Sequence, residues 1–303
     1  MRALLAPGQG AQRSGMLLPW LADPAAADRL ERWSDITGLD LRLLGTTADE
    51  AAIRETHVAQ PLLVATALLA LRRWLPTTEA VHAACGLVAG HSVGEFVAAA
   101  AAGVLTDDDA MRLVAIRGRA MSRACAPVGA TGMTAILGGE DVAVAAAISA
   151  AGAVVATVNA RGQVVAAGSA AALATLAANP PAGARLVALP VAGAFHTATM
   201  AAAVSDLRTA FDDITPGPVR VPMVLNRDGQ ITSDPGEVIA EMITQVAAPV
   251  RWDLCQAQIA ASGVTEVIEL PPSGTLTALA RREMPTVARV PVNTPADLPG
   301  AES

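Results

Sequence analysis

The sequence predicts an α/β fold in which an open parallel sheet is wrapped by helices and interrupted by an inserted subdomain. Short apolar runs typical of buried strands alternate with helical patterns in the N-terminal part of the chain. From about Gly129 the order becomes strand, helix, two strands, helix and strand, which is that of a ferredoxin-like unit. With 303 residues, of which 52% are hydrophobic, the chain can build one large core and a smaller inserted domain.

The alternation is clearest before the insert. The strands are recognised as short apolar runs, and the helices by apolar residues at helical spacing. The predicted elements are a strand at 2–6, helices at 25–38 and 60–75, a strand at 85–89 and a helix at 95–102. This succession favours a sheet whose strands are parallel and connected by helices.

The next helix carries an arginine on its apolar face. Thr106 and Asp109 form a capping-box pattern that starts this helix. Its polar face holds Arg112, Arg119 and Arg123. Arg117 instead falls among the apolar residues, and a buried guanidinium needs a partner because its desolvation is costly. Two partners are considered, a core carboxylate in a structural ion pair or the carboxylate of a substrate, held in a bidentate pair.

The insert is predicted at residues 128–193, between core segments 1–127 and 194–290. Its predicted elements are strands at 133–137, 154–159, 163–167 and 185–190 and helices at 141–151 and 170–178. Arg161 and Gly162 make the tight turn between its two middle strands. Its two ends, near Pro127 and Gly193, should lie close together, as an inserted domain requires.

The core resumes after the insert. Helices are predicted at 197–211 and 237–247, and strands at 223–226 and 264–269. Residues 291–303 are rich in proline and small residues and are expected to be a flexible tail.

The segment from Gly90 to Gly94 has the layout of a nucleophile elbow. A buried strand ends, the chain turns sharply through Ser92, and a helix of small residues starts at once. The flanking glycines fit a turn that brings backbone too close for a Cβ atom. Ser92 is therefore predicted to be a nucleophile for covalent acyl transfer, at a helix N-terminus whose amides can stabilise an oxyanion.

A serine nucleophile needs a base and two oxyanion donors. The chain has four histidines: His57, His82, His91 and His196. The side chain of His91 should diverge from that of Ser92 at the sharp turn, so packing beneath the elbow suits it better. His196 is favoured because it lies where the insert returns to the core, at a cleft between domains. The amide of Val93 is one predicted donor, and the Gly8–Gly10 loop supplies the other unless it is a plain glycine turn.

Composition excludes several function classes. All 21 basic residues are arginines and tyrosine is absent, which rules out lysine Schiff bases, a lysine-dependent phosphate loop and phenol catalysis. A net charge of -7 argues against nucleic-acid binding. Three scattered cysteines indicate neither a disulfide framework nor a metal site, and no cofactor is expected. Without a signal peptide or an apolar run long enough for a membrane span, a soluble, cytoplasmic protein is expected.

Several motifs together resemble those of one enzyme family. They are Gly8-Gln9-Gly10-Ala11-Gln12, Gly90-His91-Ser92-Val93-Gly94-Glu95, Arg117, Asn159 with Gly162-Gln163-Val164-Val165, Ala194-Phe195-His196, Asn226-Arg227-Asp228-Gly229, and Gln245 with Pro249-Val250-Arg251-Trp252. In this order, over about residues 1–285, the sequence is similar to the malonyl-CoA:acyl carrier protein transacylases, which include the acyltransferase domains of fatty-acid and polyketide synthases. Free-standing actinobacterial members resemble it most.

The resemblance implies an α/β-hydrolase-like core with a ferredoxin-like insert and a site between them. It implies that Ser92 is acylated, that His196 is the base, and that a backbone carbonyl at Gln245 orients this histidine. Gln9 and Val93 would supply the oxyanion amides, and Arg117 would bind the malonyl carboxylate. The implied substrate-binding set also holds His91, Asn159 and Phe195. Phe195 is typical of malonyl-selective members, because its ring disfavours a methyl branch on the substrate.

The sequence departs from the family pattern at three places: Ala11 in the first loop, Phe96 after Glu95, and the turn Pro271-Pro272-Ser273-Gly274. None of these removes a reacting group. The expected activity is malonyl transfer from malonyl-CoA to the phosphopantetheine thiol of acyl carrier protein through malonyl-Ser92, for fatty-acid synthesis. The alternatives are a trans-acting acyltransferase of a polyketide pathway, a hydrolase of carrier-protein thioesters, and a non-catalytic docking subunit.

The expected partners are malonyl-CoA and acyl carrier protein, and a monomer is expected. Carrier proteins are generally acidic, and so is this chain, so docking should use a local basic patch. The candidates for that patch are Arg161, Arg185, Arg281 and Arg282.

Overall fold

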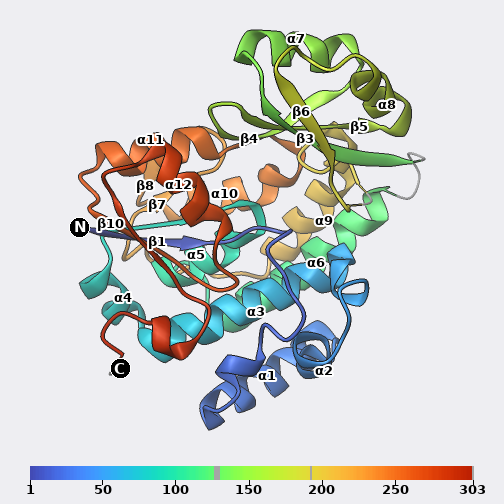
Figure 1. The fold of residues 1–303 in the computed structure, drawn as a ribbon. Coiled ribbons are helices and arrows are strands. Elements are labelled where there is room, and N and C mark those ends of the chain that lie inside the picture. Colours follow the sequence, from blue (N-terminus) through green and yellow to red (C-terminus); the bar gives the residue numbers. More distant parts are fainter. Residues whose placement is uncertain (126–129, 192, 302–303) are drawn as a thin grey trace.

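The computed structural model describes residues 1–125, 130–191 and 193–301 and has two sheets (Figure 1). The larger, six-stranded sheet has the order β11-β10-β1-β2-β7-β8, and the smaller one the order β6-β3-β5-β4-β9. The predicted α/β class, a parallel-sheet core with a ferredoxin-like unit, is confirmed. The two parts lie one above the other in Figure 1, with the smaller sheet at the top.

The six-stranded sheet is parallel except at one edge. Its strands are β1 (Arg2–Ala6), β2 (Leu87–Gly90), β7 (Met223–Val224), β8 (Ile231–Thr232), β10 (Glu266–Glu269) and β11 (Ala288–Pro291). Only β7 and β8 pair antiparallel. The central strand β1 pairs with β2 and β10, so its end and that of β2 reach the same edge of the sheet. This edge is where a doubly covered parallel sheet places its functional loops.

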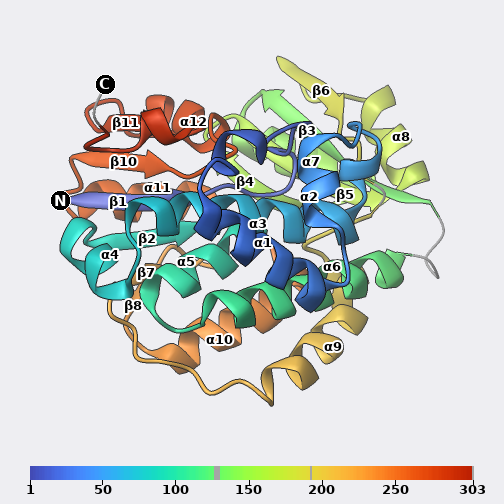
Figure 2. The same ribbon diagram turned by 90° about the horizontal axis from the view of Figure 1, so that it is seen from below.

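Helices cover both faces of this sheet (Figure 2). On one face lie α1 (Pro24–Thr37), α2 (Leu41–Thr46), α3 (Thr56–Trp74), α4 (Thr78–Ala84), α5 (Glu95–Ala102) and α6 (Asp107–Cys125). The opposite face is covered by α11 (Trp252–Ala261) and α12 (Thr275–Glu283). Leu4 packs in the apolar cluster on the face covered by α1–α6, and Leu5 packs in the cluster on the face covered by α11 and α12. They differ because successive side chains of a strand point to opposite faces. Both are fully buried, so the sheet forms the middle layer of the core.

The smaller sheet has the strand order of a ferredoxin-like unit. Its strands from the insert are β3 (Thr131–Gly138), β4 (Val154–Ala160), β5 (Gln163–Ser169) and β6 (Ala184–Ala188), and its helices are α7 (Asp141–Ala150) and α8 (Ala170–Ala178). These four strands pair antiparallel. A short strand of the core, β9 (Val250–Arg251), adds to β4 in parallel and connects the two parts.

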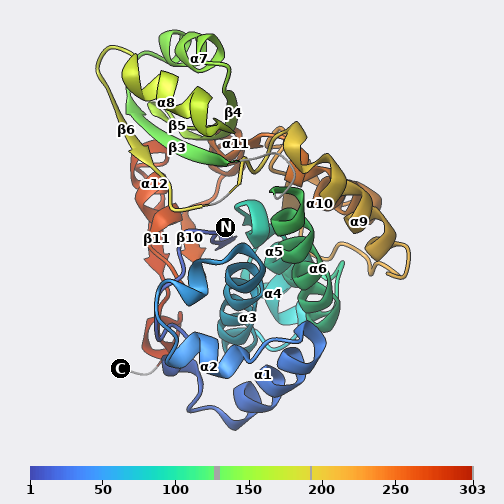
Figure 3. The ribbon, with the colours of Figure 1, turned by 90° about the vertical axis from the view of Figure 1, so that its right-hand side faces the viewer.

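The face of the smaller sheet turned away from α7 and α8 packs on the core. There the apolar side chains of β3–β5 meet α6 and α9 (Ala201–Phe211). Figure 3 shows this subdomain above the ends of α5 and α6, with α9 and α10 (Pro235–Thr244) beside them. The loops that follow β1 and β2 line one cavity together with residues of the subdomain.

The structure departs from the sequence-based expectations at the C-terminal tail and in several short elements. Residues 292–301, expected to be flexible, pack on the core: Val292 is fully buried, and Asp297 caps a short turn by accepting from the amides of Asn293 and Thr294. The apolar side chains Val292 and Leu298 outweigh the polar composition of the tail. The sequence analysis did not predict helices α2, α4, α11 and α12 or strands β8, β9 and β11, all of which are short.

The domain bounds 1–127, 128–193 and 194–290 stay a prediction, and the junction at 127/128 lies outside the described residues. No single helix within the described ranges has the length and apolarity of a membrane span; α3 and α4 pass that test only as a pair bent by 76°.

The elbow imposes a steric requirement at Gly94. This residue has an ordinary helical φ of -61°, but a Cβ there would overlap the backbone carbonyl of Ala6 on β1. Neither backbone segment can move without disturbing the sheet or the elbow.

We therefore expect Gly94→Ala to lower the free energy of unfolding by at least about 3 kcal/mol, as measured by urea denaturation. Gly132→Ala is the matched control, because a Cβ there meets nothing closer than 3.5 Å, the distance to Leu173 Cδ1. Equal, small effects of both substitutions would show that the elbow does not need this close approach.

Candidate active site

Two residues with unusual backbone geometry form a hydrogen-bonded pair. Ser92 lies between β2 and α5, and His196 lies where the chain returns from the insert to the core. Their φ angles are 53° and 59°, and they are the only non-glycine residues with positive φ in the described part of the chain. Such left-handed conformations are costly, and they cluster at functional sites. Ser92 Oγ lies 2.7 Å from His196 Nε2.

The other ring nitrogen of His196 fixes its tautomer. His196 Nδ1 lies 2.9 Å from the backbone carbonyl oxygen of Gln245, which can only accept. Nδ1 must therefore carry the proton, and Nε2 is free to accept one from the serine hydroxyl. This is the arrangement of a nucleophile and its base, with a carbonyl in the place of an acidic residue.

His196 is neutral over the physiological pH range. Burial lowers its pKa, and the positive charge of Arg117 lowers it further, to about 3. The hydrogen bond to Gln245 opposes this shift because it favours the protonated ring. A neutral imidazole is the form that can accept the serine proton.

Arg117 lies beside the serine, fully buried, on α6. Its guanidinium donates to Gln60 Oε1 at 2.8 Å, to Gln245 Oε1 at 2.8 Å and to Ser92 Oγ at 3.1 Å. The ring of Phe96 lies 5.9 Å from the guanidinium carbon. Burial lowers the pKa of Arg117 to about 10, an effect that Glu95 partly offsets, so the group stays charged at neutral pH.

Of the two partners considered for Arg117, a core carboxylate is not in contact with it. Within residues 1–125, 130–191 and 193–301, no carboxylate forms an ion pair with this guanidinium, and its Nε has no hydrogen-bond partner. The polar face of α6 is as predicted, with Arg112, Arg119 and Arg123 exposed. A buried cation held by neutral acceptors is suited to bind an anionic group.

Behind the serine lies a buried polar network. Gln245 Nε2 donates to Glu95 Oε2 at 2.5 Å and to the carbonyl of Ser92 at 3.1 Å. Asn226 Oδ1 accepts from the amide of Ser92 at 2.8 Å, and the Asn226 amide donates to Glu95 Oε1 at 2.9 Å. All four side chains are buried, so these bonds fix the elbow from below.

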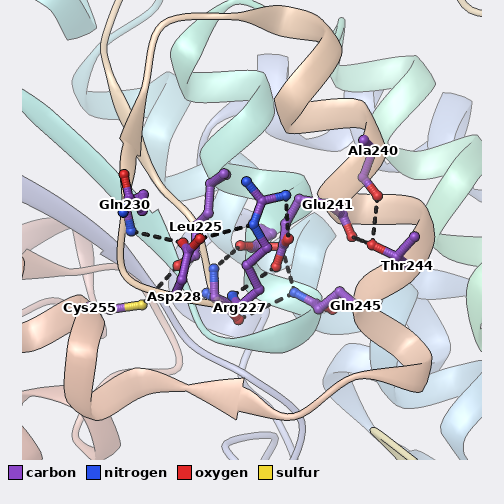
Figure 4. A network of polar contacts seen from close by, with 11 residues as sticks. Leu225, Arg227, Asp228, Gln230, Ala240, Glu241, Thr244, Gln245 and Cys255 are labelled. Atoms are coloured by element: carbon purple, nitrogen blue, oxygen red, sulfur yellow. Dashed lines mark hydrogen bonds and ion pairs between the residues drawn. The ribbon is translucent and has the colours of Figure 1, made fainter. Parts of the chain in front are cut away.

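A second buried carboxylate borders this network (Figure 4). Glu241 and Gln245 point from the C-terminal part of α10 and the turn after it toward Arg227, whose amide donates to Glu241 Oε1 at 3.0 Å. Burial, with repulsion from Glu241 as a second cause, raises the pKa of Glu95. Burial likewise raises the pKa of Glu241, and the positive charge of Arg227 opposes this shift.

A cavity of about 250 Å³ opens over Ser92 and His196. Its lining comes from both parts of the fold: Gln9, Gln60 and Met121 from the core, Thr157, Asn159 and Gln163 from the insert, and Leu276 and Leu279 from α12. Phe195 also lines it and is 5% exposed. A site between the two parts is thus where the sequence predicts it.

The predicted oxyanion donors flank the serine. Val93 follows it directly and is fully buried, and Gln9 lies in the loop after β1 that lines the cavity. Gln60 Nε2 donates to Gln9 Oε1 at 3.3 Å, and Gln9 Nε2 to Thr56 Oγ1 at 3.2 Å, which fixes this loop against α3.

His91 and Asn159, both expected to bind substrate, bond to each other. His91 Nε2 lies 2.9 Å from Asn159 Oδ1, and the His91 ring packs edge-on against Trp252 at 5.5 Å. Burial lowers the pKa of His91, and the hydrogen bond to Asn159 opposes this shift. This bond joins the elbow to β4 within the lining of the cavity, so the two residues hold the two parts of the site together.

Sequence reasoning assigned no role to Gln60, Glu95 and Asn226. Glu95 and Asn226 stand in the recognised motifs, yet nothing in a sequence shows that they bond to one another. Gln60 had a signal: it is a polar residue within an otherwise apolar helix, and it is fully buried.

Comparisons with known proteins agree with this geometry. The acyl transferase domain family model matches residues 4–296. The malonyl CoA-acyl carrier protein transacylase of Mycobacterium tuberculosis is 46% identical over 302 residues, which cover 98% of each chain. The crystal structure of the MCAT from Mycobacterium tuberculosis superposes with a TM-score of 0.94 over 98% of this chain and 97% of that one, at 46% identity.

A second solved structure, "PlMCAT:AntF (holo)", is described as a type II PKS acyl-carrier protein in complex with its malonyl-transacylase. It has a TM-score of 0.88 at 32% identity and covers 98% of this chain and 97% of that one.

The lowered pKa of His196 predicts a pH profile. Because the folded-state pKa lies near 3, well below the ordinary 6.5, the basic form persists as the pH falls through 6.5. We expect the rate of Ser92 labelling by a fluorophosphonate to change less than about twofold between about pH 8 and pH 5. Ser92→Ala is the control for labelling elsewhere. A loss of rate with a midpoint near 6.5 would contradict the buried, neutral histidine.

Proposed function

The chain belongs to the acyl transferase domain family, and on this premise we propose that it is a malonyl CoA-acyl carrier protein transacylase working through a malonyl-Ser92 intermediate. It transfers malonyl groups from malonyl-CoA to acyl carrier protein. The observation that carries the mechanism is the buried guanidinium of Arg117, 3.1 Å from Ser92 Oγ and paired with no carboxylate of the described residues.

The first half-reaction acylates the serine. His196 Nε2 takes the hydroxyl proton as Ser92 Oγ attacks the thioester carbonyl of malonyl-CoA. The amides of Gln9 and Val93 stabilise the oxyanion of the tetrahedral intermediate. The carbon–sulfur bond then breaks, the CoA sulfur takes the proton from His196, and malonyl remains on Ser92 as an ester.

The second half-reaction reverses the roles. The phosphopantetheine thiol of the carrier protein loses its proton to His196, and its sulfur attacks the ester carbonyl. The bond to Ser92 Oγ breaks, and His196 returns the proton to the serine. No other acid or base is needed, because the two half-reactions are chemically symmetrical.

Arg117 supplies the recognition of the acyl group. In a malonyl ester one methylene separates the carbonyl carbon from the carboxylate, so a guanidinium beside Oγ is within reach of that carboxylate. Binding brings an anion to a desolvated cation, where the attraction is stronger than in water. Phe195 borders the same cavity and is suited to exclude a methyl branch on the middle carbon.

Docking of an acidic carrier protein needs basic residues near the cavity. Arg282 on α12 donates to the carbonyl of Arg161 at 2.7 Å and to Gln163 Oε1 at 3.3 Å. Because Gln163 lines the cavity, Arg161 and Arg282 are close to a residue of its wall. These two suit docking better than Arg185, which lies on the edge strand β6, and Arg281 stays a candidate.

Fatty-acid synthesis stays the favoured pathway. The alternative is that the enzyme is a trans-acting acyltransferase of a polyketide pathway. A cytoplasmic location and a monomeric state also stay predictions.

The mass of the intact protein tests the proposed function. After brief incubation with malonyl-CoA we expect one malonyl adduct, which moves to carrier protein when its phosphopantetheinylated form is added. Ser92→Ala should form no adduct, since it removes the hydroxyl that is bonded to His196 Nε2.

Each other outcome has a defined meaning. An adduct lost to water as fast as to carrier protein would replace the transferase with a hydrolase. An adduct on Ser92→Ala would refute the nucleophile, and no adduct from any acyl-CoA would leave only a docking subunit.

A further inference from the structure

The side chain of Gln245 lies between a buried cation and a buried carboxylate. Its Oε1 accepts from Arg117 at 2.8 Å, while its Nε2 donates to Glu95 at 2.5 Å. The backbone carbonyl of the same residue accepts from His196 Nδ1 at 2.9 Å. Gln245 is 3% exposed, so both contacts are made away from water.

The orientation of this amide is determined by its neighbours. Around Nε2 lie three acceptors: a carboxylate oxygen of Glu95, the carbonyl of Ser92 and Oδ1 of Asn226. A flipped amide would set its oxygen against all three and its NH₂ group against the guanidinium, which has no acceptor atom. The amide oxygen must therefore face Arg117.

Arg117 donates to two side chains besides that of Ser92, and both are uncharged amides. Gln60 Oε1 is the second, at 2.8 Å, and Gln60 is fully buried. A carboxylate in either place would form a charge-assisted pair with the guanidinium and neutralise it. The negative charge of Glu95 acts on Arg117, and the side-chain amide of Gln245 bonds to both residues.

We propose that the side chain of Gln245 is a positioning and selectivity residue: its amide aligns Arg117 and separates it from Glu95, so that the guanidinium charge is left for the carboxylate of the acyl group. This rests on the proposed function, in which Arg117 binds that carboxylate. The backbone carbonyl of Gln245 thereby positions His196, and the side chain of Gln245 positions Arg117. The backbone contact survives substitution, so the side-chain role can be tested separately.

The test compares acylation of Ser92 by malonyl-CoA and by acetyl-CoA, each over a range of concentrations. Gln245→Glu sets a carboxylate against Arg117, where it competes with the malonyl carboxylate. The lost bond from Nε2 to the Ser92 carbonyl should lower kcat/KM for both thioesters. We expect kcat/KM for malonyl-CoA to fall at least about tenfold further than that for acetyl-CoA, with the added loss mainly in KM. The exposed Gln258→Glu makes the same chemical change on α11, outside the site, and should alter neither.

Gln245→Met is the second variant, in case a new carboxylate prevents folding. It removes the amide without adding charge and leaves the guanidinium free to turn toward Glu95. We again expect kcat/KM to fall further with malonyl-CoA than with acetyl-CoA. Losses of the same size with both thioesters would overturn the proposal, because the side chain would then support only the pair of Ser92 and His196. No loss with either thioester would also overturn it, because the side chain would then have no measurable role.

Arg117→Ala separates this proposal from the proposed function. If this variant loses malonyl and acetyl transfer equally, the carboxylate role of Arg117 is wrong, and the role of Gln245 falls with it. If Arg117→Ala is selectively impaired with malonyl-CoA but both Gln245 variants keep the wild-type preference, only the inference on Gln245 is wrong.

Discussion

A positive charge buried beside the nucleophile is the constraint on which the rest of the site depends. Arg117 is fully buried, yet its side-chain partners are amide oxygens and a hydroxyl. Burial lowers the pKa of His196, and the charge of Arg117 lowers it further, which helps to maintain the histidine as a base. The histidine is oriented by a backbone carbonyl, which adds no negative charge to the surroundings of the guanidinium. The missing acid of the triad is thus consistent with the chemistry of an anionic substrate.

The second constraint is the backbone conformation of Ser92 and His196. Ser92 and His196 both hold left-handed φ values, and each is fixed by hydrogen bonds from outside its own element. The amide of Ser92 donates to Asn226, and the amide of His196 donates to the carbonyl of Val246. Glycines at 90 and 94 let β1, β2 and α5 approach within backbone contact. The dyad is therefore held by the core, while the insert contributes the walls of the cavity.

Much of this could be predicted from particular residues. The apolar runs at 2–6 and 85–89 predicted the central strands, and the change of pattern after Gly129 predicted the ferredoxin-like unit. Arg117 was found because it broke the periodicity of an otherwise amphipathic helix. Short elements such as β9 and α12 were missed, because tertiary pairing rather than local pattern stabilises them.

The polar network could not be predicted in the same way. The contact of His196 with Gln245 uses a backbone carbonyl, which every residue has, so residue physics gives no signal for it; only the resemblance pointed to that position. The bonds among Gln245, Glu95 and Asn226 join positions up to 150 residues apart, and their polarity depends on the folded geometry.

The most direct test of the account is the crystal structure of the malonyl-enzyme. The account predicts the malonyl carboxylate paired with the Arg117 guanidinium, with the bonds of Arg117 to Gln60 and Gln245 retained. A carboxylate turned toward the cavity mouth, with Arg117 paired instead to Glu95, would contradict it.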